Sequence, residues 1–153
     1  MKVYVASSWR CERQSLVVAA LRAAGHEVYD FKNPAPGDHG FGWQQVTPEP
    51  PPWSAEKTRE VLAHPVAERG FGLDLSALEW CEALVMVQPC GRSAALELGY
   101  VAGMGKRTCV LLDDFCEPEL MLKVADKLCV TLDEVVEFLK TAGAGALRHE
   151  EKE

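Results

Sequence analysis

Two patterns of apolar residues alternate along this chain, one typical of buried strands and the other of helices packed on one side. Apolar runs of strand type cover residues 2–6, 26–31, 83–88, 107–112 and 127–130. Helical spacing and helix-boundary residues predict helices over 12–24, 55–63, 72–81, 118–125 and 132–141, and another helix follows Gly91. Strands that alternate with helices in this way predict an α/β protein with a parallel sheet and helices on both faces.

Residues at the helix ends support these boundaries. Leu16 and Leu21 belong to the apolar face expected for the first helix, and Gly25 follows where a left-handed residue is favoured. The connection from this helix into the second strand should be right-handed. Thr131 and Glu134 form the pattern of a capping box, which predicts the start of the last helix.

A long segment rich in proline and tryptophan interrupts the pattern at residues 33–70. A loop of this length inside a compact domain is either disordered or functional, and its aromatic residues favour a partly ordered lid. Ser54 is a typical N-cap for a short helix within it, and Pro65 is expected to end that helix. We expect residues 1–142 to form a single domain, followed by a polar, frayed tail at 143–153.

Composition and charge narrow the function classes. The chain has 153 residues, of which 48% are hydrophobic and 25% charged, as in an ordinary soluble domain. A net charge of −7 argues against a broad surface for a nucleic acid polymer. A small anionic ligand remains compatible with this charge, because two or three local donors suffice to hold it.

The cysteine pattern indicates neither disulfides nor a metal site. The six cysteines are scattered, mostly within or beside apolar runs, and no CxxC pair or Cys/His cluster with zinc spacing occurs. We therefore expect small buried thiols in a reducing compartment, and no metal or cofactor. The amino terminus runs directly into a strand pattern, so we expect no signal peptide or membrane span and a cytoplasmic location.

Three turns qualify for ligand binding, because ligands of parallel sheets sit at the carboxyl ends of the strands. They are ASSWRCE after the first strand, the Pro/Trp loop after the second, and QPCGRSA after the third. In CGRSAALELGY, a tight turn presents backbone amides at a helix start, where an anion can bind. Glu97 follows one turn inside this helix. By itself this position is more typical of a surface glutamate, because the helix dipole favours an acidic residue in the first turns.

The sequence resembles the nucleoside 2-deoxyribosyltransferases and the related 5'-monophosphate deoxynucleoside N-glycosidases. The resemblance covers nearly the whole core, through VYVASSWR, the aspartate of LDLSALEWCEALVMV, ALELGYVAGMGKRTCVLL and PELM. The ELGYxxGxGK part is fairly specific. The resemblance implies a flavodoxin-like (Rossmann-like) fold with a five-stranded parallel sheet, and a homodimer or larger assembly that needs no cofactor.

The resemblance also implies catalytic roles. Glu97 matches the nucleophile that attacks the anomeric carbon and forms a covalent glycosyl-enzyme, which passes its sugar to water or to a second base. Tyr4 matches a tyrosine that orients this nucleophile, with a plain core aromatic as the alternative. Asp74 matches an aspartate near the leaving base, where a second carboxyl helps protonate that base. A helix-start residue is the alternative for Asp74.

Candidate phosphate donors bear on the choice between nucleoside and nucleotide. They follow the first and third strands and comprise Ser7, Ser8, Arg10, Gly91, Arg92 and Ser93. The transferases tend to carry an acidic residue where this chain has Gly91, so hydrolysis is slightly favoured over transfer. PCGRSAALE is also similar in spacing to the PGGxGTxxE turn of cytokinin-releasing phosphoribohydrolases, although Cys90, Ser93 and Ala94 depart from that pattern.

Aromatic residues are candidates for a wall that stacks on the base. The candidates are Trp9, His39, Trp43, Gln44 and Trp53, although Trp43 and Trp53 are equally compatible with fastening the long loop to the sheet. Met121, with Glu119, matches a place where the family lets a neighbouring subunit complete the site. Glu119 stands where the transferases usually have asparagine.

These patterns together predict an enzyme that cleaves or transfers at the N-glycosidic bond of a nucleoside or its 5'-monophosphate. A non-catalytic sensor that binds a nucleotide derivative in the same cleft is the main alternative. A structural or assembly module is a third, and it predicts no small-molecule effect. Release of base from a panel of substrates indicates the enzyme. A ligand that stabilises the protein without reacting indicates the sensor.

Overall fold

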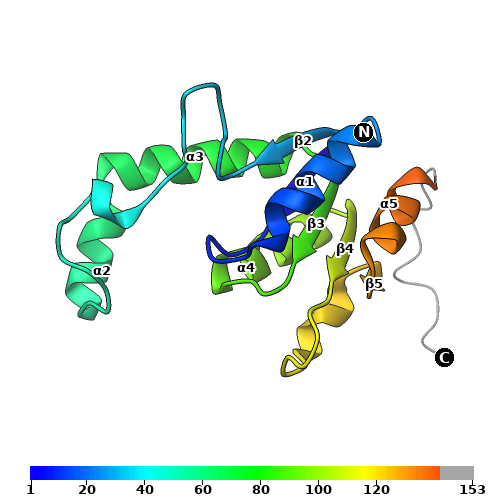
Figure 1. Cartoon of the computed structure of the whole chain (residues 1–153). Coiled ribbons are helices and arrows are strands. Elements are labelled where there is room, and N and C mark those ends of the chain that lie inside the picture. The colour runs from blue at the N-terminus through cyan, green and yellow to red at the C-terminus, as the bar shows by residue number, and fades with distance from the viewer. Residues whose placement is uncertain (142–153) are drawn as a thin grey trace.

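A five-stranded parallel sheet forms the centre of the molecule (Figure 1). The computed structural model describes residues 1–141, so the polar tail predicted at 143–153 lies outside the described residues. The strands are β1 (Lys2–Ala6), β2 (Glu27–Asp30), β3 (Ala83–Val87), β4 (Arg107–Leu111) and β5 (Lys127–Cys129). They pair in the order β2-β1-β3-β4-β5, every pair parallel, which confirms the predicted flavodoxin-like sheet.

Helices cover both faces of the sheet, as predicted. On one face, α1 (Arg13–Ala23) and α5 (Leu132–Lys140) bury Val17, Leu21 and Val135 against β1, β3 and β4. On the other face, α3 (Pro65–Trp80) and α4 (Arg92–Gly103) bury Leu78 and Leu98. The central strand β3 is buried along its whole length, because helices lie above and below it and strands lie on both sides.

Three shorter elements lie outside these layers. The helix α2 (Ala55–Leu62) stands beyond the edge of the sheet and contacts α3 (Figure 1). Two 3₁₀ turns, η1 (Trp43–Gln45) and η2 (Leu120–Val124), lie in the loops after β2 and β4. Within residues 1–141, no helix combines the length and the apolar character that crossing a membrane requires.

Most predicted helix ends agree with the structure. Gly25 has a φ of +87° after α1, a conformation that only glycine adopts without strain. Ser54 caps α2 by accepting a hydrogen bond from the amide of Lys57 at 3.2 Å. Thr131 accepts from the amide of Glu134, whose carboxylate accepts from the residue before the cap. Local sequence therefore sets these boundaries.

The face that α1 turns to the sheet differs from the prediction. Leu16, expected on the apolar side, is 67% exposed, whereas Gln14 and Val18 are buried beside Val17 and Leu21. The buried amide of Gln14 donates to the carboxylate of Asp30 at 2.7 Å. This hydrogen bond offsets the cost of burying Gln14, so the helix packs with a polar residue inward.

Pro65 begins a helix instead of ending one. Proline fits the first turn because that turn leaves its N–H groups unpaired, and the His64 ring caps the helix by accepting from the amide of Val66 at 3.2 Å. The resulting α3 has 16 residues, so the segment 65–70 is helical and not loop. Asp74 consequently lies in the middle of a long helix and not at a helix start.

All six cysteines are free thiols. Four are buried, as expected from their apolar surroundings, whereas Cys90 is partly exposed and Cys116 is exposed. Cys90 and Cys116 follow β3 and β4, where the chain leaves the sheet for the loops at its carboxyl edge.

Candidate active site

A cavity of about 520 Å³ lies at the carboxyl ends of β1 and β2. It is bounded by residues that follow these strands, by α3, and by the first turns of α4. Its volume falls in the range of about 300–1,000 Å³ typical of small-molecule sites. The cavity therefore occupies the edge of the sheet at which parallel α/β proteins bind ligands.

The lining of this cavity changes in character along α3. Asp74 borders it together with Ser7, Ser93 and Glu97, which supply polar groups. Val66 lies eight residues earlier on α3, about 12 Å along the helix axis at about 1.5 Å per residue. Around this earlier part of α3 the lining combines aromatic and aliphatic residues with the charged Glu68, Arg69 and Asp38, so Glu97 and Asp74 mark one end of the cavity and a mixed lining marks the other.

Glu97 is directed to the cavity by the packing of α4. Ala94 and Leu98 are buried against the sheet, and Glu97 is partly buried on the adjoining side of the helix. Burial raises the pKa of Glu97 from its ordinary value of 4.5 to about 7, and the negative charge of Asp74 adds to the rise. The side chain therefore exchanges its proton near neutral pH.

Asp74 faces the same end of the cavity from α3. The hydroxyl of Tyr29 donates a hydrogen bond to its Oδ1 at 2.9 Å. Burial raises the pKa of Asp74 above its ordinary value, and the hydrogen bond from Tyr29 opposes that rise. Asp74 and Glu97 thus form a carboxyl pair in which the charge of Asp74 disfavours the ionisation of Glu97.

Tyr4 lies beneath this carboxyl pair and is fully buried. Its ring stacks on that of Tyr29, with centroids 5.2 Å apart and planes inclined by 23°. Burial and the charges of Glu97 and Asp74 raise the pKa of Tyr4, which keeps its hydroxyl protonated. This hydroxyl lies close enough to Glu97 to lower the pKa of that carboxyl, although the two groups do not reach hydrogen-bond geometry.

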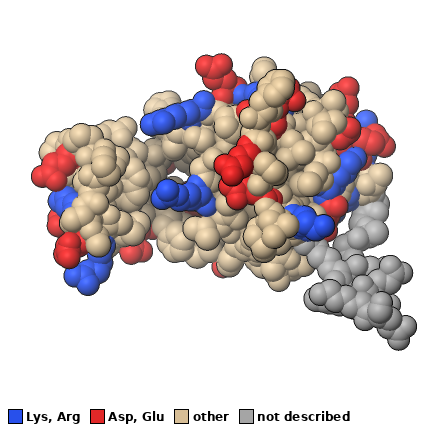
Figure 2. Space-filling view, turned by 90° about the horizontal axis from the view of Figure 1, so that it is seen from below, with Lys and Arg blue, Asp and Glu red and all other residues tan. Residues whose placement is uncertain are grey.

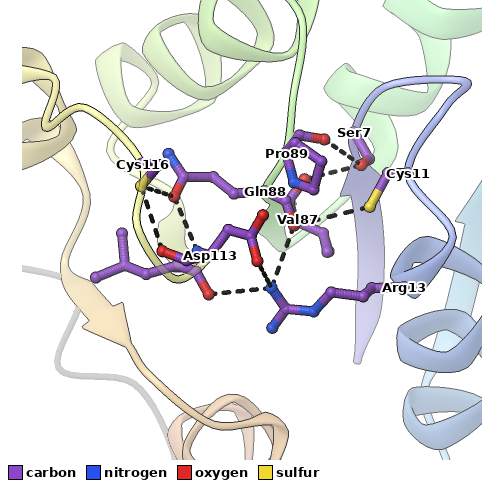
Figure 3. Close-up of polar contacts among 9 residues, drawn as sticks. Ser7, Cys11, Arg13, Val87, Gln88, Pro89, Asp113 and Cys116 are labelled. Carbon is purple, nitrogen blue, oxygen red and sulfur yellow. Dashed lines mark hydrogen bonds and ion pairs between the residues drawn. The ribbon is translucent and has the colours of Figure 1, made fainter.

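The turn between β3 and α4 is held by side chains from α1 and from the ends of neighbouring strands (Figure 3). The guanidinium of Arg13 donates to the main-chain oxygen of Gln88 at 3.3 Å and to the carboxylate of Asp113 at 3.2 Å. The side-chain oxygen of Gln88 accepts from the amide of Asp113, and Ser7 Oγ donates to the main-chain oxygen of Val87 at 2.8 Å. These contacts fix the start of the helix that carries Glu97.

The predicted phosphate donors divide into two groups. Ser7 and Ser93 border the cavity. Gly91 is the N-cap of α4 and, lacking a side chain, makes no capping bond, so the first amides of the helix are left without a side-chain partner. The candidates that do not border the cavity within the described residues are Ser8, Arg10, Gly91 and Arg92. A role for these four in holding phosphate stays a prediction.

Aromatic residues form one wall of the cavity. Trp9 meets Phe31 edge to face at a centroid distance of 5.3 Å, and both border the cavity. Trp43 also borders it and contacts Phe41 and Trp53 edge to face. The predicted residues that do not border this cavity in the described structure are His39, Gln44 and Trp53.

The loop after β2 is fastened over the cavity at two places. Gly40 has a φ of +79°, and a Cβ there would come 2.4 Å from the main-chain oxygen of Phe31 and 2.8 Å from the Trp9 ring. Gly70 on α3 similarly lets the Phe41 ring approach the helix backbone. An ion pair between Arg69 and Asp38, at 3.5 Å, joins the same loop to α3. The glycines thus allow a close fit of the loop.

Met121 lies apart from this cavity, in the 3₁₀ turn after β4. It is 70% exposed, and its neighbour Leu120 is 78% exposed. Completion of the site by Met121 and Glu119 of another subunit stays a prediction. Among the described residues, no group of three or more His, Cys, Asp or Glu side chains is arranged to hold a metal ion.

The sequence reasoning missed Tyr29, Phe41, and the Arg69–Asp38 ion pair. A usable signal existed for Tyr29, since aligning the two predicted strands in parallel places it opposite Tyr4. For the other residues no local signal exists, because their contacts depend on how the long loop lies on α3.

Among known proteins, only solved structures match this chain, and they match by fold. No protein-family model and no curated protein matches the sequence. A 2-deoxyribosyltransferase from Bacillus psychrosaccharolyticus matches with a TM-score of 0.56 and 22% identity, over 89% of this chain and 90% of the other. A CMP N-glycosidase from Clostridium botulinum matches with a TM-score of 0.52 and 14% identity, over 91% and 98%. A conserved protein from Enterococcus faecalis matches with a TM-score of 0.56 and 11% identity, over 92% and 97%. Over about nine-tenths of its length, this chain therefore shares the flavodoxin-like fold of a 2-deoxyribosyltransferase and a CMP N-glycosidase.

Proposed function

We propose that this protein cleaves the N-glycosidic bond of a nucleoside or its 5'-monophosphate, with Glu97 as the nucleophile. The observation that carries the proposal is the pair formed by Glu97 and Asp74 at one end of a cavity of suitable size. Structures of a 2-deoxyribosyltransferase and a CMP N-glycosidase share the fold, which agrees with this chemistry.

The reaction would proceed in two displacements. In the first, a carboxylate oxygen of Glu97 bonds to the anomeric carbon while the bond from that carbon to the base nitrogen breaks. The electron pair of the broken bond goes to the base, and Asp74 supplies the proton. In the second, water attacks the anomeric carbon, its proton passes to the ionised Asp74, and Glu97 leaves as a carboxylate.

This scheme requires the carboxyl pair to hold a single proton. A pair that holds one proton supplies both an ionised nucleophile and an acid, and like charges in one site keep the two carboxyls from ionising together. The pKa of Glu97, about 7, places loss of the last proton near neutral pH. Because the charge of Asp74 contributes to this raised pKa, the single proton resides mainly on Glu97, and the productive form, with Glu97 ionised and Asp74 protonated, arises when that proton moves to Asp74. Tyr4 and Tyr29 lie where their hydroxyls affect that distribution.

The substrate is expected to lie with its sugar at the end of the cavity that Glu97 and Asp74 border. The base would then lie along α3 and against Trp9 and Trp43, since bases stack on aromatic side chains. The uncapped amides at the start of α4, together with the exposed Arg92 at the first position of that helix and the exposed Arg10 after β1, favour a 5'-monophosphate as substrate. Gly91, where the transferases tend to be acidic, favours water over a second base as acceptor.

The distribution of charged residues on the surface bears on the kind of partner. On the face shown in Figure 2, lysine and arginine residues are interspersed with acidic and neutral ones and form no continuous basic band. This face agrees with the net charge of −7, which argues against a nucleic acid polymer as partner. A small nucleoside or nucleotide is the proposed partner, and assembly into a homodimer or larger oligomer is part of the proposal.

Chromatography of released base tests the proposal directly. Purified protein is incubated with ribo- and deoxyribonucleosides and their 5'-monophosphates, with and without an acceptor base. We expect one class to lose its base, Glu97→Gln to abolish the release, and Glu137→Gln, a change on the distant helix α5, to retain it. Release by Glu97→Gln at the wild-type rate contradicts the assignment of the nucleophile. A ligand that stays intact while raising the melting temperature indicates a binding protein instead.

A further inference from the structure

Two tyrosines lie side by side beneath the carboxyl pair. Tyr4 and Tyr29 are partners in the parallel register of β1 and β2, so their side chains leave the same face of the sheet. Their rings stack at 5.2 Å with nearly parallel planes. The Tyr29 hydroxyl bonds to Asp74, and the Tyr4 hydroxyl lies near Glu97, so each tyrosine is associated with one carboxyl.

The contact of Tyr29 with Asp74 engages one of the two carboxyl oxygens of Asp74. Its hydroxyl donates to Oδ1 at 2.9 Å. Within residues 1–141, this is the one hydrogen bond to the Asp74 side chain. The second oxygen, Oδ2, has no such partner there, and both Tyr29 and Asp74 border the cavity.

We propose that Tyr29 is a positioning residue for Asp74, holding one carboxyl oxygen so that the other faces the leaving base. This inference rests on the proposed function and specifies how the acid of the pair is oriented. A carboxyl group at the end of two rotatable bonds gains orientation from such a bond, and a misplaced acid transfers its proton poorly. The ring of Tyr29 is itself fixed by stacking on the fully buried Tyr4.

Tyr29 also biases the position of the proton within the pair. Its hydrogen bond lowers the pKa of Asp74, against the rise that burial causes. The titratable groups around these two residues are Glu97 from α4, Tyr4 from β1 and Asp38 from the loop after β2. Without the hydroxyl, Asp74 should stay protonated to higher pH, and its weaker average charge should lower the pKa of Glu97.

The test replaces single tyrosine hydroxyls. Tyr29→Phe removes the hydroxyl and keeps the ring that stacks on Tyr4. Tyr100→Phe is the matched control, because Tyr100 lies on α4, is 42% exposed and does not border the cavity. For Tyr29→Phe we expect kcat to fall about 10- to 100-fold with KM within about threefold, as for impaired proton transfer. The acid limb of its kcat/KM profile should move to lower pH, and Tyr100→Phe should match the wild type.

A second measurement works without turnover. The Asp74 carboxyl is titrated by carbon-detected NMR in the wild type and in Tyr29→Phe, with thermal melting to check that the variant folds. We expect a higher Asp74 pKa in the variant. An unchanged Asp74 titration, or a kcat and pH profile equal to those of the wild type, overturns the inference. A wild-type protein that releases no base overturns the proposed function and the catalytic part of this inference, while the titration still decides whether Tyr29 holds Asp74.

Discussion

Replacing Glu97 by glutamine should stabilise the protein at alkaline pH and leave its stability nearly unchanged at acidic pH. The reason is that the fold raises the pKa of this carboxyl from 4.5 to about 7, chiefly by burial and secondly through Asp74. Ionised Glu97 is therefore less favourable in the folded protein than in the unfolded chain. Glutamine resembles the protonated acid in shape and carries no charge at any pH.

The size of the effect follows from the two pKa values. At about 1.4 kcal/mol for a tenfold change, a rise from 4.5 to about 7 corresponds to a cost of about 3 kcal/mol. Below the unfolded pKa both states hold the proton, and the cost is absent. It develops as the pH rises from 4.5 and is complete above about 7, since the carboxyl is then ionised in both states.

Urea denaturation of the wild type and Glu97→Gln at about pH 5 and about pH 8 measures this difference. We expect the variant to be more stable by about 2–3 kcal/mol at the higher pH, a rise in Tm of about 5–10 °C for a chain of this length, and by well under half of that at the lower pH. Glu137→Gln, on an exposed part of α5, should show no such pH dependence. An advantage of Glu97→Gln that is equal at both pH values, or a loss of stability at about pH 8, refutes the reasoning.

Two further changes test the cavity. Asp74→Asn should move the acid limb of the kcat/KM profile below about pH 7, because the charge of Asp74 contributes to the raised pKa of Glu97. The same change should lower kcat about 100-fold or more, because the acid that protonates the base is lost. An acid limb that stays in place contradicts the effect of Asp74 on Glu97. Gly40→Ala should raise KM for the preferred substrate about tenfold, because its Cβ would meet Phe31 and the Trp9 ring and displace the loop. Gly37→Ala controls for backbone strain, because Gly37 has a similarly positive φ and a Cβ there meets nothing within 4 Å. Equal KM values in the two variants contradict the role of the close fit at Gly40.

Much of the fold could be read from local patterns. The five strands and their parallel pairing follow from apolar runs separated by helices, and Ser54, Gly25 and Thr131 mark helix ends because capping depends on neighbouring residues. The prediction failed in two places for different reasons. In α1, Gln14 is buried with a hydrogen bond to Asp30 on another element while Leu16 faces solvent, which no local pattern indicates. At Pro65 the local signal had two meanings, because proline both follows helix ends and fits the first turn of a helix, and here it begins α3.

Sequence alone determined the order of elements and brought Glu97, Asp74 and Tyr4 forward as candidates, because periodicity and motifs are properties of neighbouring residues. Only the tertiary structure decided that Asp74 and Glu97 share one cavity, that Tyr29 bonds to Asp74, and that the loop is fastened on α3. A pKa is a comparison between a charge in water and the same charge in its folded surroundings. Those surroundings are assembled from β1, β2, α3 and α4, so the raised pKa of Glu97 exists only once these distant segments meet.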